Sequence, residues 1–212
     1  MGEFLTQYGA EMLQHTGEHL VLVLVSIAIA VVAGVPLGIL ITRRPRWSAW
    51  VLGFANIVQT IPSLALFGLL IPLPLLGGIG TRTAILALTL YALLPIIQNT
   101  YLGITGVDVA VREAGRGMGM TDWQLLMQVE IPLALSVMLG GIRIATVIAV
   151  GVATIAAAIG AGGLGVFIFR GVAVVDHQLI LAGAVPAAGM AIAADFLLAL
   201  LERRLKIGAG VN

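Results

Sequence analysis

The sequence has no cysteine among its 212 residues, and charged residues are scarce. Without thiols, the chain has no disulfide, no thiolate nucleophile and no thiolate metal ligand. Charged residues make up only 10% of the chain, whereas soluble domains average about 25%. The formal net charge of +1 provides no basic excess for binding a nucleic acid. These absences argue against a soluble protein and exclude thiol chemistry.

Two further signatures are missing. No lysine or arginine precedes Arg43, so the first apolar run lacks the basic region of a signal peptide, and we expect it to remain as a membrane span. The chain also has no Gly-x4-Gly-Lys-Ser/Thr pattern for binding nucleotide phosphates. We therefore expect no enzymatic activity, no ATP hydrolysis by this chain itself and no cofactor.

Long apolar runs dominate the sequence instead. Apolar residues make up 60% of it, and the mean hydropathy is +1.11. The run Leu20–Ile41 is 22 residues without a charge, enough to cross a hydrocarbon core of about 30 Å at about 1.5 Å per residue. We predict an all-α integral membrane protein with about five transmembrane helices, at about 20–41, 50–70, 83–102, 133–159 and 179–201. We expect kinks or breaks at Pro36, Pro62, Pro72, Pro74 and Pro95.

The basic residues predict the orientation of these spans. If the N-terminus lies outside, eight basic residues face the cytoplasm and only two, Arg82 and Arg170, face outward, as the positive-inside rule requires. The eight are Arg43, Arg44, Arg46, Arg112, Arg116, Arg203, Arg204 and Lys206. We divide the chain into an external N-terminal segment (1–19), a transmembrane domain (20–205) and a cytoplasmic tail (206–212).

A polar segment, Val107–Pro132, separates the third and fourth predicted spans. It holds four of the ten acidic residues: Asp108, Glu113, Asp122 and Glu130. Apolar residues at helical spacing predict a helix from about Val107 to Arg116, with Val107, Ala110, Val111 and Ala114 on one face. A second helix is predicted from Thr121, with a Thr121–Gln124 capping box and a staple between Met120 and Leu125. Pro132 either ends that helix or opens the next. A polar helical hairpin between spans is typical of a docking element.

The same segment carries a family signature. Glu113-Ala114-Gly115, then Gly119, then Val129-x-Ile131-Pro132 resembles the EAA motif of binding-protein-dependent ABC importer permeases, with Gly115 in place of the second alanine. The resemblance implies a type I ABC importer permease, a transport subunit in a bacterial inner membrane. The segment would be its coupling helix. The residues implied in coupling to an ATPase are Arg112, Glu113, Ala114, Gly115, Arg116, Gly119 and Pro132.

The resemblance also implies partners. Five spans and one docking segment are half of a transporter, so we expect two cytoplasmic ATPase subunits, a second permease chain of the same or a similar kind, and an extracytoplasmic substrate-binding protein. Gln59–Leu66, Tyr91–Pro95, Arg116–Met120 and Ile159–Gly165 look like the osmoprotectant branch, which imports glycine betaine, choline or carnitine. Three alternatives remain: a permease for another solute such as methionine, an ion-driven secondary transporter, and a membrane scaffold without a pathway.

Five polar residues within or beside the spans are candidates for the pathway or its gating: Gln59, Ser63, Asn99, Arg143 and Asp195. Gln59 and Ser63 are four residues apart, which would place them on one helix face. Arg143 and Asp195 lie at similar depths, so they could form an ion pair that changes between transport states. The alternatives are interhelical hydrogen bonds and a static ion pair or bonds from Arg143 to backbone carbonyls.

Two short patterns match known site motifs in residue type and spacing, but not in structural context. Gly160-x-Gly162-x-x-Gly165 fits a dinucleotide fingerprint, but it follows a membrane span rather than a strand, so we interpret it as a flexible external loop that serves as a gate or contacts the binding protein. His15-x-x-Glu18-His19 fits a zinc pattern, but Gly17 weakens the helix and no third ligand stands out. We expect no metal site and a solvated N-terminal helix.

Overall fold

The chain folds into helices throughout the part that the structure, a computed structural model, describes: residues 2–73 and 77–208. The elements are α1 (Gly2–Arg43), α2 (Pro45–Thr60), α3 (Ser63–Leu70), α4 (Thr81–Thr105), α5 (Val109–Gly117), α6 (Asp122–Leu125), the π-helical turn η1 (Leu126–Glu130), α7 (Ile131–Ile155), the 3-10 turn η2 (Ala156–Ile159), α8 (Gly165–Val174) and α9 (His177–Gly208). The predicted break at Pro74 and the last four residues of the predicted tail lie outside the described residues.

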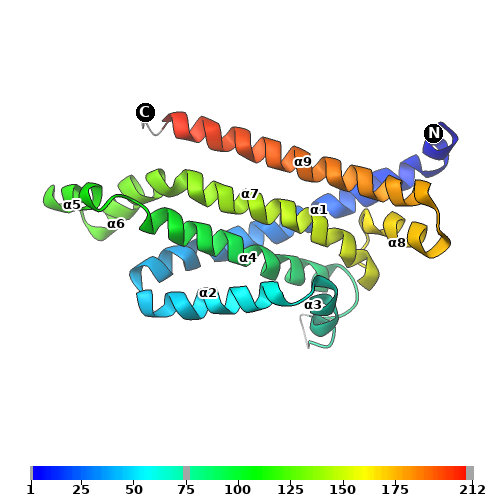
Figure 1. Ribbon diagram of the computed structural model, residues 1–212, viewed down its shortest axis with the longest axis horizontal. Coiled ribbons are helices and arrows are strands. Elements are labelled where there is room, and N and C mark those ends of the chain that lie inside the picture. Colours follow the sequence, from blue (N-terminus) through cyan, green and yellow to red (C-terminus); the bar gives the residue numbers. More distant parts are fainter. Residues whose placement is uncertain (1, 74–76, 209–212) are drawn as a thin grey trace.

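Four helices in the described ranges are long and apolar enough to cross a membrane, and a bent pair, α2 with α3, makes a possible fifth. Figure 1 shows α1, α4, α7 and α9 running side by side in one elongated bundle. Within it, α4 packs against both α1 and α7, and α9 packs against α7. The all-α membrane fold and the spans predicted at 83–102, 133–159 and 179–201 are therefore confirmed.

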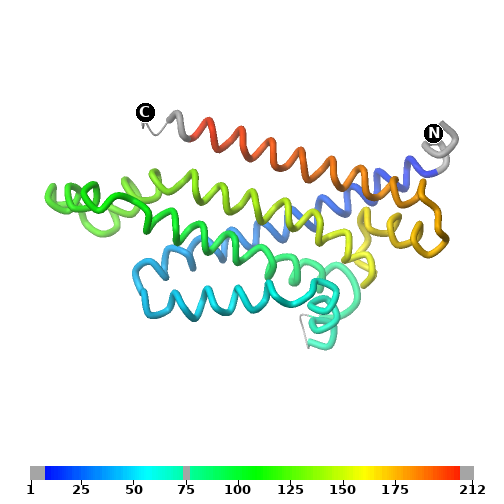
Figure 2. The backbone as a smooth tube through the Cα atoms, in the orientation of Figure 1, coloured from blue at the N-terminus to red at the C-terminus, as the bar shows by residue number. Residues whose placement is uncertain are grey.

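The bundle has two distinct ends. One, called here the hairpin end, carries α5 and α6, the connection from α1 to α2 and the end of α9 (Figure 1). The other, the opposite end, carries the N-terminal part of α1, with α3 and α8, as the tube in Figure 2 also shows. The predicted N-terminal segment is thus the first part of one unbroken helix that continues through Pro36 to Arg43.

The predicted span at 50–70 corresponds to the bent pair α2 and α3, and the break predicted at Pro62 is confirmed. The chain breaks after Thr60, and α2 and α3 meet at an angle of 104°. Ile61 is extended, with ψ of 126°, because the ring of Pro62 disfavours a helical conformation in the residue before it. Gln59 and Ser63 consequently lie on different helices and do not share one helix face.

Small residues allow the long helices to approach closely. A Cβ atom added to Gly38 of α1 would lie 2.6 Å from Cβ of Thr100 on α4. Between α4 and α7, a Cβ atom on Gly141 would lie 2.5 Å from Cβ of Asn99 and 2.6 Å from the Pro95 carbonyl oxygen. Membrane helices lack a hydrophobic driving force between them, so backbone approach at such glycines is what allows dispersion contacts to form.

We predict that Gly141→Ala lowers the stability of the purified chain by about 1–3 kcal/mol, the usual cost of overpacking. Gly140→Ala is the matched control, because a Cβ atom there meets no atom within 4 Å and the change in helix propensity is the same. The measurement is thermal unfolding in detergent. Equal melting temperatures for the two variants would contradict this account of the α4–α7 contact.

Candidate functional site

The hairpin end contains two short helices whose ends are well defined. Asp108 is the N-cap of α5, and its side chain accepts a hydrogen bond from the Ala110 backbone N at 2.8 Å. Helix α5 therefore begins at Val109, two residues later than predicted. The capping box between Thr121 and Gln124 is confirmed at the start of α6. Between the helices, Gly119 has φ of +83°, a conformation that residues with a Cβ atom rarely adopt.

Gly115 and Gly119 shape the hairpin itself. A Cβ atom at Gly115 would lie 2.8 Å from Cδ1 of Leu125 and 3.1 Å from Sδ of Met120, so this glycine lets α5 pack closely on α6. A Cβ atom at Gly119 meets nothing within 4 Å, so its backbone conformation, rather than space, accounts for the glycine there. Both were predicted to contact an ATPase; their observed contacts and conformation are internal to the hairpin.

The outer surface of the hairpin is a mixture of exposed apolar and charged side chains. We call it the docking surface. It consists of Val109, Val111, Glu113, Ala114, Arg116, Met118 and Trp123, all exposed. Met118 is 77% and Trp123 66% exposed, although both are large apolar side chains. Of the predicted apolar face, only Val107 is buried. Several large apolar side chains exposed on one short polar hairpin are typical of a protein interaction surface.

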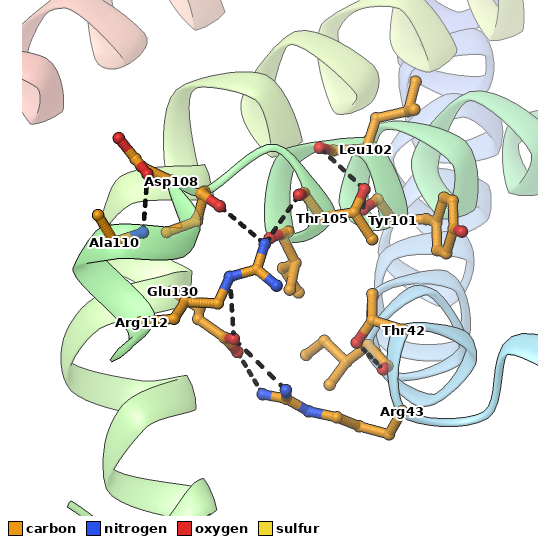
Figure 3. Close-up of polar contacts among 12 residues, drawn as sticks. Thr42, Arg43, Tyr101, Leu102, Thr105, Asp108, Ala110, Arg112 and Glu130 are labelled. Atoms are coloured by element: carbon orange, nitrogen blue, oxygen red, sulfur yellow. Dashed lines mark hydrogen bonds and ion pairs between the residues drawn. The ribbon is translucent and has the colours of Figure 1, made fainter. Parts of the chain in front are cut away.

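Arg112 points away from this surface into the molecule, as Figure 3 shows. Its Nη2 atom donates to the carbonyl oxygens of Ile104, Thr105 and Val107 at 3.0, 2.8 and 2.8 Å. Its Nε atom lies 3.7 Å from Oε1 of Glu130. Arg112 was predicted to act in coupling to an ATPase, but these contacts hold it against the end of α4.

Glu130, which the sequence analysis did not single out as a site residue, is fully buried between two arginines. Arg43, the last residue of α1, donates from Nη2 to Oε2 and from Nη1 to Oε1, the latter at 3.4 Å. We call Arg43, Arg112 and Glu130 the Glu130 cluster (Figure 3). A signal was available: Glu130 is an isolated acid beside an apolar span, and Arg43 was predicted on the same membrane side.

The hairpin is continuous with the bundle on one side. Helix α6 passes through the π-helical turn η1 directly into α7, without a break at Pro132. Pro132 lies in the first turn of α7 and is exposed, so of the two predicted alternatives it opens a helix rather than ending one. Proline has no backbone N–H to donate. It is tolerated in the first turn of α7, because the π-helical turn η1 before it offers that N–H no regular α-helical acceptor.

Three of the predicted pathway residues lie near the break in α2–α3 or within α4. Gln59 donates from Nε2 to the Tyr91 carbonyl oxygen at 3.4 Å, a long contact that ties α2 to α4. Asn99 donates to the Pro95 carbonyl oxygen at 2.8 Å and lies against Gly141. Ser63 is the first residue of α3. The contact of Gln59 fits the alternative of an interhelical hydrogen bond, whereas that of Asn99 lies within α4, and a role in the pathway stays a prediction for all three.

Arg143 and Asp195 form the ion pair that their depths suggested. Nε of Arg143 lies 3.1 Å from Oδ1 of Asp195, and Nη1 lies 3.6 Å from Oε2 of Glu202. Glu202 also accepts a hydrogen bond from the Ser136 hydroxyl at 2.7 Å. One cation on α7 thus holds two carboxylates on α9. Whether the pair changes during transport stays a prediction.

At the opposite end, the N-terminal part of α1 packs on α8 and its preceding loop. Arg170 of α8 donates to both carboxylate oxygens of Glu11, at 2.9 and 3.4 Å. Glu18 accepts from the Gly163 backbone N at 3.0 Å and lies 2.8 Å from Nδ1 of His15. These contacts differ from the solvated helix predicted there, because the glycine loop supplies the Gly163 N–H to Glu18 and α8 supplies Arg170 to Glu11.

The comparisons with known proteins agree with this architecture. Residues 34–207 match the family model described as binding-protein-dependent transport system inner membrane component. The chain is 45% identical to the glycine betaine/carnitine/choline transport system permease protein OpuCB of Bacillus subtilis, over 97% of this chain and 93% of that protein. It is 49% identical to the osmoprotectant import permease protein OsmW of Salmonella typhimurium, over 88% of each chain.

Solved structures share the fold. The MetNI methionine ABC transporter, in inward-facing conformations, superposes with a TM-score of 0.82 at 25% identity, covering 91% of this chain and 95% of that one. An amino acid ABC transporter with histidines superposes with a TM-score of 0.76 at 21% identity, covering 94% and 96%. The bundle is therefore that of a type I ABC importer permease. The chain belongs to the family of binding-protein-dependent transport system inner membrane components.

The Arg143–Asp195 contact predicts non-additive mutations. Arg143→Ala should destabilise the chain more than Asp195→Ala, because it removes the contacts of Arg143 with both Asp195 and Glu202, whereas Asp195→Ala removes only one of them. In the double variant the two effects should fall short of their sum by about 0.5–3 kcal/mol, the usual coupling between contacting residues. The measurement is the free energy of unfolding in mixed micelles. Strictly additive losses would contradict a direct pair.

Proposed function

We propose that this chain is the membrane-spanning subunit of an ATP-driven importer for quaternary-amine osmoprotectants of the glycine betaine, choline and carnitine type. A partner ATPase hydrolyses the ATP, and this chain forms half of the translocation pathway. The observation that carries the proposal is the docking surface: an exposed apolar and charged face on a hairpin outside the long helices. Two relatives support the substrate class: OpuCB is named for glycine betaine, carnitine and choline transport, and OsmW for osmoprotectant import.

The distribution of basic residues supports a cytoplasmic position for the hairpin end. Arg43, Arg44 and Arg46 lie at the connection from α1 to α2, and Arg203 and Arg204 lie at the end of α9, with Arg112 and Arg116 on α5. Arg82 and Arg170 belong to elements of the opposite end. The positive-inside rule then orients the hairpin toward the cytoplasm, within reach of an ATPase, and the N-terminus outward.

On the docking surface, Glu113 and Arg116 provide the polar contacts and the exposed apolar side chains provide the packing. The side chains of Glu113 and Arg116 have no hydrogen bond or ion pair to other residues in the described part of the chain, so both are available to a partner. Trp123 and Met118 are the side chains whose burial would contribute most, since large apolar groups dominate interface energetics.

One docking surface seats one ATPase subunit, so two ATPase subunits require two permease chains. The chain is 45% identical to OpuCB and 47% identical to OpuCD, two permease proteins of the same transport system in Bacillus subtilis. This supports pairing with a copy of this chain or with a similar one. A substrate-binding protein would deliver its cargo at the opposite end, where the loop before α8 lies against α1.

Nucleotide binding would close the two ATPase subunits and move both hairpins. Because α6 continues through η1 into α7, displacement of a hairpin reaches a long helix directly. The paired chains would then change from inward-facing to outward-facing, and hydrolysis would reset them. The Arg143–Asp195 pair between α7 and α9 is a contact that such a movement could break, and Gln59, Ser63 and Asn99 remain candidates for the pathway.

The test is purification of the tagged chain from its native membrane in mild detergent, with mass spectrometry of the proteins retained. We predict that a P-loop ATPase co-purifies and that Glu113→Arg reduces its recovery at least tenfold, because the variant reverses an exposed charge on the docking surface. Gly119→Trp should abolish recovery as well, but through distortion of the turn, so Glu113→Arg is the cleaner variant.

The matched control is Arg82→Glu, a charge reversal of the same size at an exposed position of the opposite end. It should leave recovery of the ATPase unchanged. A chain that purifies without any ATPase under all mild conditions would contradict the proposal and favour an ion-driven transporter. In that case Asp195, the acid predicted within a span, would be the first residue to substitute.

A further inference from the structure

The Glu130 cluster joins the hairpin to two helices with which it is not continuous. Glu130 accepts hydrogen bonds from Arg43 through both carboxylate oxygens, and Arg112 approaches Oε1 at 3.7 Å. A carboxylate that is fully buried is costly unless it is paired, so the fold depends on at least one of these cations staying in place. Arg43 belongs to α1 and Arg112 to α5, and their only common ion-pair partner in the described residues is Glu130.

Arg112 extends the cluster to α4. Its Nη2 atom donates to three carbonyl oxygens where α4 ends, at Ile104, Thr105 and Val107. The C-terminal end of a helix has carbonyl groups without intrahelical donors and carries a partial negative charge. A guanidinium group supplies both the hydrogen-bond donors and a compensating positive charge. Figure 3 shows Arg112 between these carbonyls and Glu130, with Arg43 on the far side of the carboxylate. The cluster therefore connects α1, α4, α5 and η1.

The backbone under Glu130 is also unusual. Glu130 is the last residue of the π-helical turn η1, which lies between α6 and α7. Such turns insert a residue into a helix and occur often at functional sites. Because η1 is continuous with α6, a displacement of the hairpin carries the Glu130 carboxylate with it. Arg43 belongs to α1, so the displacement exerts a force on the ion pair between Arg43 and Glu130.

We propose that Glu130 is a positioning residue for energy coupling: its carboxylate passes the displacement of the hairpin to α1 and, through Arg112, to α4. The inference rests on the proposed docking of an ATPase at the hairpin. Docking and transmission use different side chains, since no residue of the Glu130 cluster belongs to the docking surface. Loss of the Glu130 charge should therefore leave the ATPase bound but separate ATP hydrolysis from transport.

The experiment uses the complete co-purified complex in proteoliposomes and measures ATP hydrolysis and uptake of radiolabelled glycine betaine, choline or carnitine on the same vesicles. Glu130→Gln keeps the shape of the side chain and removes its charge. We expect uptake per ATP hydrolysed to fall at least tenfold, with recovery of the ATPase within twofold of wild type. A role confined to stability would lower the melting temperature without changing that ratio.

Arg43→Gln is the second variant, because Arg43 lies at a helix end and its substitution is less disruptive than one at a fully buried site. It should lower the ratio in the same way. Arg44→Gln is the matched control: the neighbouring arginine is exposed and has no ion pair within residues 2–73 and 77–208, so the ratio should not change. The double variant Arg43→Gln/Glu130→Gln should be no worse than Glu130→Gln alone.

Two results would overturn the inference. One is an uptake-to-ATP ratio within twofold of wild type in both Glu130→Gln and Arg43→Gln. The other is loss of the ATPase from these two variants, which would assign the cluster to docking or folding instead. An ATPase absent from the wild-type preparation is a different result, because it contradicts the proposed function itself and removes the basis of the inference with it.

Discussion

A charged side chain in a membrane-spanning bundle must reach water or find a partner of opposite charge, and the few charges of this chain are placed accordingly. Glu130 lies between Arg43 and Arg112 at the hairpin end, and Arg143 holds Asp195 and Glu202 between α7 and α9. Glu11 pairs with Arg170 at the opposite end. The Arg43–Glu130, Arg143–Asp195 and Glu11–Arg170 pairs each join elements distant in sequence, so these charges help to determine which helices stay together.

Packing at small residues complements these pairs. Gly38 lets α1 approach α4 and Gly141 lets α7 approach α4, so α4 is closely packed on two sides. Glycine contacts are rigid because they leave no side chain to rearrange, whereas ion pairs can exchange partners or open. The bundle thus combines a tightly packed centre, around α4, with polar contacts at its ends, where a partner protein would act on it.

Much of this could be predicted from sequence, and the exceptions have physical causes. Apolar runs of span length, interrupted only by Arg143 and Asp195, identify α4, α7 and α9, and the Thr121–Gln124 capping box is local, so both were predicted correctly. The break at Pro62 was predicted, whereas the angle of 104° between α2 and α3 depends on tertiary packing and was not predicted. A π-helical turn has no simple sequence pattern, which is why η1 and the role of Glu130 were missed. Arg112 was predicted to act in coupling because of its place in the family motif, but its contacts with the end of α4 and with Glu130 follow only from the fold.

The central claim is that hydrolysis of ATP by a partner protein at the hairpin drives transport through this bundle. The most direct test is uptake of glycine betaine, choline and carnitine by proteoliposomes that contain the purified complex, comparing enclosed ATP with an imposed sodium or proton gradient. We predict uptake that requires enclosed ATP and the substrate-binding protein and that no ion gradient can replace. Uptake driven by a gradient without ATP, or by this chain alone, would contradict the account.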